Sequence, residues 1–211
     1  MKLSVIMPSF LGPYPGAAPN RSVKFVRAVN SFISQRAKDS ELIIVSDGCD
    51  DTIRIVEKNY AKNPRIKLVK LPRHELFTGA VRQAGVEVAS GDVICNLDSD
   101  DTLMQNHLAN IQASFRPDKY DWAYFGHRTA LDEIKMEPIF HDVKPELGSI
   151  GNGNIAWKRN LDVTWDGCSG KQDNQLFISQ LIKKYPNCQR LYGCGYVVRH
   201  AIIQRYKPNI K

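Results

Sequence analysis

The sequence predicts an α/β fold in which a mostly parallel central sheet carries helices on both faces. Two observations predict it. Through the first 125 residues, short apolar runs rich in β-branched residues alternate with stretches of helical periodicity, the order that builds a parallel sheet. Most of these runs are apolar at consecutive positions, as strands are when helices cover both of their sides. The length of 211 residues suits one domain, so we expect a single domain over residues 1–211.

The expected strands are the apolar runs themselves, taken in chain order. Each is short and bounded by polar or turn-forming residues, which favours a strand over a buried helix. Val197 and Val198 predict a further, closing strand. The main runs lie at residues 3–7, 42–45, 66–71, 93–97 and 122–125.

The expected helices lie between these strands, where apolar residues recur three or four positions apart on one helical face. Past residue 126 the alternation loosens, until a last helical face near the C-terminus. In chain order the faces are formed by Phe25, Val29, Phe32 and Ile33; by Ile53, Val56 and Tyr60; by Phe77, Val81, Ala84 and Val88; by Met104, Leu108, Ile111 and Phe115; and by Ile178, Leu181, Ile182 and Tyr185.

The positive net charge favours anionic partners but does not identify one. The formal net charge is +7 and the pI about 9.2, an excess that favours approach to nucleotides, acidic glycans, lipid headgroups or DNA. The basic residues are scattered, with no run of five or more. A basic surface that only aids solubility therefore explains the charge equally well.

Cysteine usage and hydropathy bear on the compartment. The five cysteines form no CxxC pair and leave an odd count, which indicates neither a disulfide scaffold nor a zinc knuckle and is typical of the reducing cytosol. No stretch approaches the ~18 apolar residues of a spanning helix. We therefore expect a cytoplasmic protein whose contact with a membrane, if it has one, is peripheral.

Acidic residues follow the second expected strand. Ligands of such sheets bind at the carboxyl ends of the strands, which makes Asp47 a candidate for ligand binding. A structural explanation also exists, because Gly48 suits a turn and Asp51 or Thr52 could cap the next helix. That explanation fits Asp50 and Asp51 better than Asp47.

A denser acidic cluster follows the fourth expected strand. Asp98, Asp100 and Asp101 stand within four residues, and such carboxylates repel one another unless a cation lies between them. Oxygen ligands of this kind suit Mg²⁺ or Mn²⁺. Capping of the following helix would account for Asp101 alone, so the cluster predicts a metal site at Asp98 and Asp100.

The motifs, in their order and spacing, resemble the inverting family 2 glycosyltransferases of the GT-A fold over about residues 2–200. The resemblance implies the fold of a nucleotide-diphospho-sugar transferase, with a nucleotide-sugar-binding half at about residues 1–125 and an acceptor-binding and catalytic-base half at about 126–211. It also implies a UDP-sugar donor and a Mn²⁺ or Mg²⁺ ion. The segments that carry it are SVIMPSF, NSFISQ, ELIIVSDGCDD, GAVRQAGVEVASGDVICNLDSDD, GNIAWKRN and KQDNQLFISQLIKKY.

The resemblance assigns roles to the acidic residues. Asp98 looks like the carboxylate that meets the ribose of the donor, with Ser99 beside it, and Asp100 like the one that binds the metal at the diphosphate. Asp47 stands where the family has an aspartate that reads the uracil ring.

Two further segments are assigned to the donor. Pro8, Ser9 and Phe10 resemble the family's first nucleotide-contacting loop. Arg82 stands where the family has an arginine facing the donor pocket, although Gln83 replaces the asparagine that usually follows it.

The catalytic base is expected in the second half. Inverting transfer needs a carboxylate to take the acceptor's proton, and Gln172-Asp173 resembles the family's Glu-Asp pair, whose second member is that base. Asp173 would also favour a helix N-terminus for structural reasons alone. His200 resembles a late histidine that binds the metal in many GT-A enzymes, but a lone histidine is equally an ordinary surface or core residue.

Two departures from the family pattern shape the expected reaction. The loop of residues 11–19, LGPYPGAAP, is longer than the family's tight connection and could cover the donor or shape the acceptor site. The sequence printed after His200 lacks the aromatic-rich motif and membrane helices of processive synthases, so transfer of a single sugar is expected. The expected acceptor is a hydroxyl of a glycan or lipid-linked saccharide.

Other functions remain open at this point. A phage-type enzyme that glycosylates a hydroxymethylated DNA base fits the positive charge, although no DNA-binding motif is present. A non-catalytic nucleotide-sugar or nucleic-acid binding module also fits the charge, but Asp98, Asp100 and Asp173 together argue against it. A nucleotidyltransferase would need a basic phosphate loop after the first strand, and no basic residue precedes Arg21 there.

Overall fold

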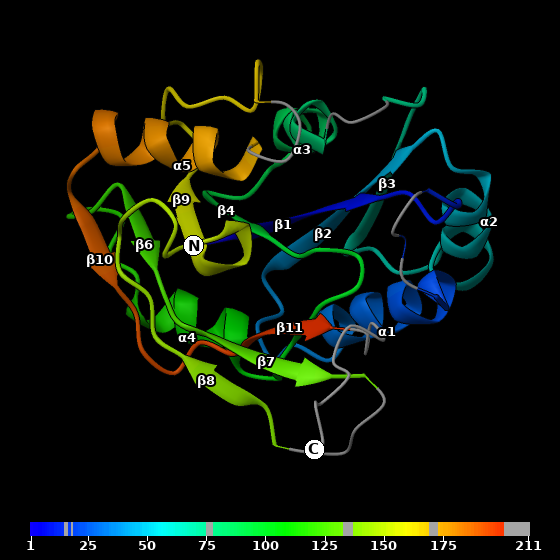
Figure 1. The fold of residues 1–211 in the computed structure, drawn as a ribbon, viewed down its shortest axis with the longest axis horizontal. Helices are drawn as coiled ribbons and strands as arrows, with labels where there is room; N and C mark the ends of the chain where they lie inside the picture. The colour runs from blue at the N-terminus through cyan, green and yellow to red at the C-terminus, as the bar shows by residue number, and fades with distance from the viewer. Residues whose placement is uncertain (15–16, 18, 75–77, 133–136, 169–172, 201–211) are drawn as a thin grey trace, which may run out of the picture.

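In the computed structural model the chain forms two sheets with helices packed around them (Figure 1). The structure describes residues 1–14, 17, 19–74, 78–132, 137–168 and 173–200, with the side chain of His200 left out. The larger sheet has seven strands in the order β10-β6-β9-β4-β1-β2-β3. Their bounds are β1 Leu3–Ser9, β2 Ser40–Asp47, β3 Ile66–Leu71, β4 Val93–Asn96, β6 Trp122–Tyr124, β9 Ile155–Lys158 and β10 Cys188–Arg190.

The centre of this sheet is parallel, as the sequence predicts. β1 lies between β2 and β4 and runs parallel to both, and β3 continues the parallel sheet beyond β2. All eight residues of β2 and all four of β4 are buried. Beyond β4 the direction changes, because β9 runs antiparallel to both β4 and β6, while β10 at the edge runs parallel to β6.

Helices cover both faces of the sheet, and residues of one strand alternate between the two cores. Val5 of β1 packs in a core with Phe25 of α1 and Leu108 of α4, whereas Ile6 packs in the opposite core with Val81 of α3. Figure 1 shows α3 and α5 on one side of the sheet and α1 and α4 on the other. The helices are α1 Arg21–Ile33, α2 Asp50–Asn59, α3 Thr78–Glu87, α4 His107–Ser114 and α5 Asp173–Lys184.

All five expected helices are present, but the fourth begins later than its periodicity predicts. Met104 does not join α4, because residues 102–103 form strand β5 and the Met104 amide donates to the Gly195 carbonyl at 2.7 Å. Pairing with a distant strand therefore takes priority over local helical periodicity.

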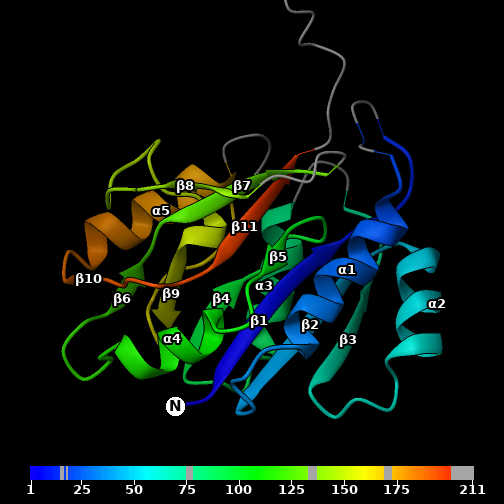
Figure 2. The same ribbon diagram turned by 90° about the horizontal axis from the view of Figure 1, so that it is seen from below.

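A second sheet of four strands, in the order β5-β11-β7-β8, lies beside the first (Figure 2). The sequence predicts only part of β11, at Val197 and Val198. The strands of this sheet at residues 127–131 and 139–141 are short and partly exposed, so neither alternation nor an apolar run predicts them. The members are β5 Thr102–Leu103, β7 His127–Leu131, β8 Ile139–His141 and β11 Tyr196–His200.

No helix in the part of the chain that the structure describes is long and apolar enough to cross a bilayer.

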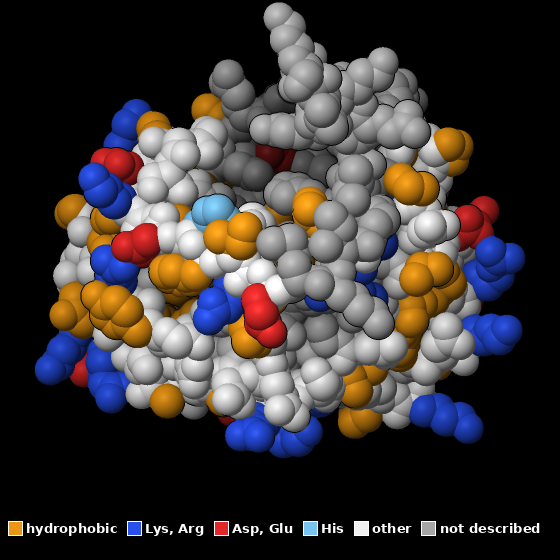
Figure 3. Space-filling model, turned by 60° about the horizontal axis from the view of Figure 1, so that its bottom comes forward, with side chains coloured by type: hydrophobic (Ala, Val, Ile, Leu, Met, Phe, Trp, Pro, Cys, Tyr) orange, Lys and Arg blue, Asp and Glu red, His pale blue; other side chains and the backbone are white. Residues whose placement is uncertain are grey.

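On the face shown in Figure 3, Lys and Arg side chains are dispersed among acidic and apolar ones. The visible face therefore carries the scattered charge that the sequence indicates, without one continuous basic patch.

Candidate active site

A cavity of about 540 Å³ opens at the carboxyl ends of β1, β2 and β4. Parallel strands bring these ends to one edge of the sheet, which is where such folds bind ligands. Eight residues that the sequence assigns to donor or metal binding line it: Pro8, Ser9, Phe10, Asp47, Arg82, Asp98, Ser99 and Asp100. Six further lining residues were not predicted: Tyr14, Arg21, Arg73, His74, Thr78 and Val81.

Asp47 ends β2 with its side chain buried, 5% of the residue being exposed. Its Oδ1 accepts a hydrogen bond from the His74 backbone N–H at 2.7 Å and lies 3.2 Å from His74 Nδ1. The Arg73 guanidinium forms an ion pair with Oδ2. A carboxylate has about four lone-pair positions, so these contacts leave capacity for a further donor.

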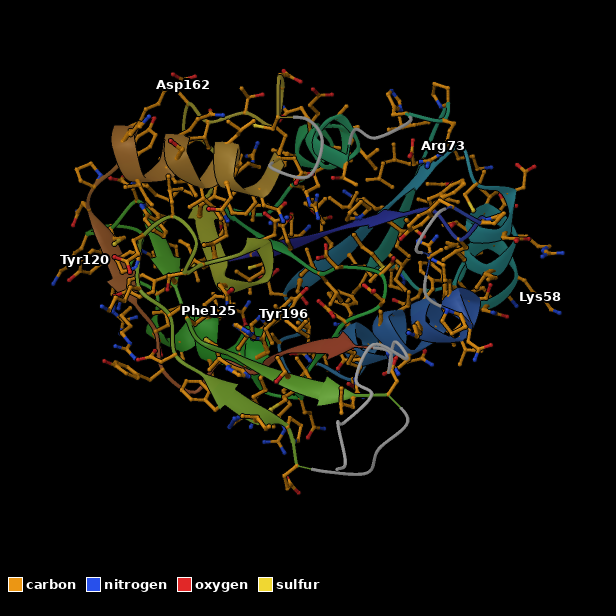
Figure 4. The ribbon with its side chains drawn as sticks, viewed as in Figure 1. Lys58, Arg73, Tyr120, Phe125, Asp162 and Tyr196 are labelled. Atoms are coloured by element: carbon orange, nitrogen blue, oxygen red, sulfur yellow. The ribbon has the colours of Figure 1, made fainter. Side chains whose placement is uncertain are left out.

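Arg73 also lies over the ring of Phe10, 3.6 Å from its centroid. Figure 4 shows Arg73 beyond the end of β3. Phe10, Arg73 and Asp47 therefore form one wall that offers an aromatic face, a cation and a carboxylate. Arg73 and His74 follow the third parallel strand, a position that could have marked them as candidates from sequence.

Arg82 connects Asp98 in the cavity to Asp173 at the start of α5. This residue of α3 is 4% exposed, and its Nη2 donates to Asp98 Oδ1 at 2.8 Å. Its Nη1 lies 3.4 Å from Asp173 Oδ2. The guanidinium also lies over the Trp165 ring at 5.2 Å. A single buried cation thus faces two carboxylates that belong to different halves of the chain.

Asp173 is the first residue of α5 and is 5% exposed. Its Oδ2 accepts a hydrogen bond from the Thr78 hydroxyl, and its Oδ1 accepts one from the Asn174 N–H at 2.6 Å. Its place in the first helical turn fits the structural explanation as well. The contacts with Arg82 and Thr78 go beyond that explanation, because they bring Asp173 to the edge of the cavity.

Asp100 and Asp98 line the cavity together. Burial raises the pKa of the Asp100 carboxyl, and the negative charge of Asp98 raises it further, while Lys24 and Arg21 act in the opposite direction. Crowding of this kind disfavours two ionised carboxylates without a cation between them.

Asp101 has a structural role that differs from helix capping. Its Oδ2 accepts a hydrogen bond from the Tyr196 hydroxyl and its Oδ1 one from the Arg199 N–H, both at 2.8 Å. The Tyr196 hydroxyl accepts in turn from the Asp98 N–H at 3.1 Å. The capping interpretation is wrong, because α4 begins only at His107; Asp101 instead ties β11 to the loop that carries Asp98.

The capping interpretation of Asp51 and Thr52 is also wrong in detail. Helix α2 begins at Asp50, so Asp50 and Asp51 lie in its first turn, where negative charge suits the helix dipole. The Thr52 hydroxyl is buried and lies 2.9 Å from that of Ser9. Asp50 and Asp51 therefore have a structural place in the first turn of α2, although neither of them caps it.

Two predicted site positions lie outside what the structure describes, as does Phe77 of the third expected helical face. Gln172 is outside the described residues, and of His200 only the backbone, which ends β11, is described. Within the described part of the chain, no group of three His, Cys, Asp or Glu side chains is arranged to hold a metal ion. His107 is buried in the core, where desolvation lowers its pKa to about 3.

The loop of residues 11–19 reaches the cavity through Tyr14. The Tyr14 and Phe10 rings are 6.5 Å apart, and Arg21 lies 4.5 Å from the Tyr14 centroid. Phe10 was expected from sequence, whereas Tyr14 and Arg21 have no periodicity or motif that would have identified them.

Comparison with solved structures places this architecture among known folds. The structure of Staphylococcus aureus TarS 1–349 in complex with UDP aligns with a TM-score of 0.74 at 21% sequence identity, over 95% of this chain and 61% of that one. The complex of the same protein with UDP-GlcNAc aligns with a TM-score of 0.72 at 20% identity, over 95% and 59%. At this identity the likeness establishes the shared GT-A fold.

Sequence relatives cover parts of larger proteins. Chondroitin synthase of Escherichia coli is 34% identical over 102 residues, 48% of this chain and 15% of that protein. The GalNAc(5)-diNAcBac-PP-undecaprenol beta-1,3-glucosyltransferase of Campylobacter jejuni is 32% identical over 111 residues, 52% of this chain and 33% of that protein. The aligned segments thus cover a third or less of these two relatives.

The family model for glycosyl transferase family 2 matches residues 17–173, which is more than half of the chain. The matched range includes the strand ends that carry Asp47 and Asp98 and ends at Asp173. This chain therefore belongs to glycosyl transferase family 2 and has the GT-A fold.

Proposed function

We propose that this chain transfers a sugar from a UDP-sugar to a hydroxyl acceptor, with inversion at the anomeric carbon and with a divalent metal ion. One observation carries the proposal: Arg82 contacts both Asp98, inside the cavity, and Asp173, at its edge. Donor-binding and proton-accepting groups therefore lie at one centre, as transfer requires. The family membership supports the class of reaction.

The donor would lie across the carboxyl ends of the strands. Phe10 offers a face for the base, and Asp47 an acceptor for the N–H of a uracil ring. Asp98, with Ser99, would meet the ribose. TarS, which shares the fold, was solved with UDP and with UDP-GlcNAc, and this supports a uridine donor here.

The residues present suit a hard divalent cation. Asp98 and Asp100 supply carboxylate oxygens inside one cavity, and burial, followed by the negative charge of Asp98, raises the pKa of the Asp100 carboxyl. Mg²⁺ and Mn²⁺ are commonly held by one or two carboxylates together with substrate phosphates. Asp100 would hold the ion, and His200 is a second proposed ligand. When bound, the ion would supply charge stabilisation at the departing diphosphate.

Asp173 would accept the proton of the attacking hydroxyl. Arg82 and Thr78 contact one of its oxygens, and the Asn174 N–H contacts the other, so its orientation is fixed before the acceptor arrives. A preoriented carboxylate at the cavity edge is what general base catalysis needs. In this proposal, residues 1–125 would bind the donor, and residues 126–211 would supply the catalytic base.

We further propose that the acceptor is a glycan or a lipid-linked saccharide. The names of the two relatives, a chondroitin synthase and an enzyme of an undecaprenol-PP-linked saccharide, support this class. The five free cysteines support a cytoplasmic location.

UDP release provides the test of this function. The chain is incubated with individual UDP-sugars and Mn²⁺, with and without glycan acceptors, and UDP is measured. We expect release from at least one UDP-sugar, and mass spectrometry should find the sugar on an acceptor. Absence of both UDP release and UDP binding would contradict the proposal. If a hydroxymethylated DNA base were the acceptor that is glycosylated, the proposed sugar transfer would stand and the proposed class of acceptor would be wrong.

A further inference from the structure

The cavity contains arginines in different electrostatic states. Arg73 forms an ion pair with Asp47, and Arg82 forms one with Asp98. Arg21 lines the same cavity but has no carboxylate partner among the residues that the structure describes. Its charge acts on Asp100, but its guanidinium is not held in an ion pair there and can contact an anion that enters the cavity.

The other cations of helix α1 emphasise this difference. Lys24 and Arg27, one and two turns beyond Arg21, both form ion pairs with Asp132, at 2.9 and 2.7 Å. Arg27 also donates to the Asp100 carbonyl at 2.9 Å. Lys24 and Arg27 are thus held in ion pairs within the fold, whereas Arg21 lines the cavity.

Arg21 is nevertheless held in place. Its Nη1 donates to the Gly12 carbonyl at 2.9 Å, and the guanidinium lies 4.5 Å from the Tyr14 ring centroid and 6.0 Å from that of Phe10. A guanidinium has five N–H donors, and within the described chain this is the hydrogen bond that Arg21 makes. A planar, preoriented group with free donors suits two oxygens of one anion.

We propose that Arg21 binds the diphosphate of the nucleotide donor and balances part of its negative charge. The inference rests on the proposed function, because the donor gives the cavity its anion. Arg21 is also the first residue of α1, a helix of 13 residues with no acidic residue in its first turn, so the helix dipole adds to its charge. Arg21 is thus a phosphate-binding residue additional to the carboxylates and metal.

Calorimetry with UDP and with uridine, in Mg²⁺, tests this directly, because the two ligands differ only in the diphosphate. Arg21→Gln should weaken UDP binding by ~10-fold or more, since charge-assisted hydrogen bonds are lost, and leave uridine binding unchanged. Arg21→Lys, which keeps the charge without the planar fork, should fall between. Arg36→Gln, at an exposed residue outside the cavity, removes the same charge and should bind both ligands as wild type does.

The outcomes separate this inference from the function on which it rests. Wild type that binds neither ligand would overturn both. Wild type that binds UDP, with Arg21→Gln binding it equally well, would overturn the role of Arg21 alone. Equal weakening of UDP and uridine in Arg21→Gln would also overturn it, because the residue would then act on the base or the fold. Thermal unfolding of each variant identifies a loss of fold.

Discussion

Arg82 Nη2 donates a hydrogen bond of 2.8 Å to Asp98 Oδ1, and the same guanidinium reaches Asp173 on its other side. The residue is almost fully buried, so its charge acts in a weakly screened environment. It links a carboxylate on the loop after β4 to one on α5, which are far apart in sequence. One side chain therefore contacts both carboxylates, and in the proposed function it would support donor binding as well as the orientation of Asp173.

Replacing Arg82 should consequently impair both binding and chemistry. Arg82→Lys keeps the charge but cannot contact two carboxylates with a planar fork. We expect donor affinity and kcat each to fall by ~10-fold or more, measured by calorimetry and by UDP release. Wild-type values for both constants in this variant would show that the bridge has no functional role.

Asp100→Ala should abolish Mn²⁺-dependent donor binding while leaving the fold intact, because the carboxylate would be the metal's protein ligand. Calorimetry of UDP with and without Mn²⁺ measures this, and circular dichroism checks the fold. Asp118→Ala, at an exposed position outside the cavity, is the matched control. Unchanged UDP and Mn²⁺ affinity in Asp100→Ala would remove Asp100 from the metal site.

Asp47 should determine the preference for uracil. If its carboxylate accepts the N–H of the base, UDP should stabilise the wild type more than GDP or ADP, and Asp47→Ala should lose much of that preference. Thermal shift with the three nucleotides gives the comparison. Equal stabilisation of the wild type by all three would contradict the assignment, as would a preference for UDP that Asp47→Ala retains.

The buried Asp101 should make stability depend on pH in a defined direction. Burial raises its pKa well above the ordinary value, with further contributions from Asp98 and Asp100. From about pH 4 upward the folded state retains a proton that the unfolded state has lost, so the free energy of unfolding should fall as pH rises through this range. Asp101→Asn should make that decline smaller and leave the part contributed by Asp100, whose pKa is also raised.

Urea unfolding from pH 4 to 7 in EDTA, comparing wild type with Asp101→Asn, measures the difference. Tyr196→Phe, which removes the hydroxyl donor to Asp101, should lower the free energy of unfolding by about 1–3 kcal/mol at constant pH. The same pH slope in wild type and Asp101→Asn would mean that Asp101 is ionised in the folded state throughout.

Much of the first 125 residues could be predicted because the signals there are local. Buried parallel strands appear as apolar runs, and the topology of such a sheet brings the residues that follow them to one edge. That reasoning identified Asp47, Asp98 and Asp100, which line one cavity. The family resemblance added Arg82 and Asp173, which contact each other.

The rest depends on contacts between distant segments. The position of Arg73 after the third strand could have marked it as a candidate, but no local pattern predicts that it pairs with Asp47 or that Thr78 donates to Asp173. The strands of the second sheet are short and gain their stability from pairing with one another, so their sequences look irregular. The start of α4 was misplaced for the same reason, since the chain at Met104 pairs with Gly195.

The assignment of Asp173 as the general base is the central claim, and Asp173→Asn tests it most directly. The amide keeps the size of the side chain but cannot accept the acceptor's proton, and donor binding is assigned to other residues. Donor affinity by calorimetry should stay close to wild type, while kcat for transfer falls ~10²- to 10⁴-fold. Asp166→Asn, at an exposed carboxylate nearby in sequence, should transfer normally. Transfer by Asp173→Asn above about a tenth of the wild-type rate, or loss of transfer in Asp166→Asn instead, would place the base elsewhere.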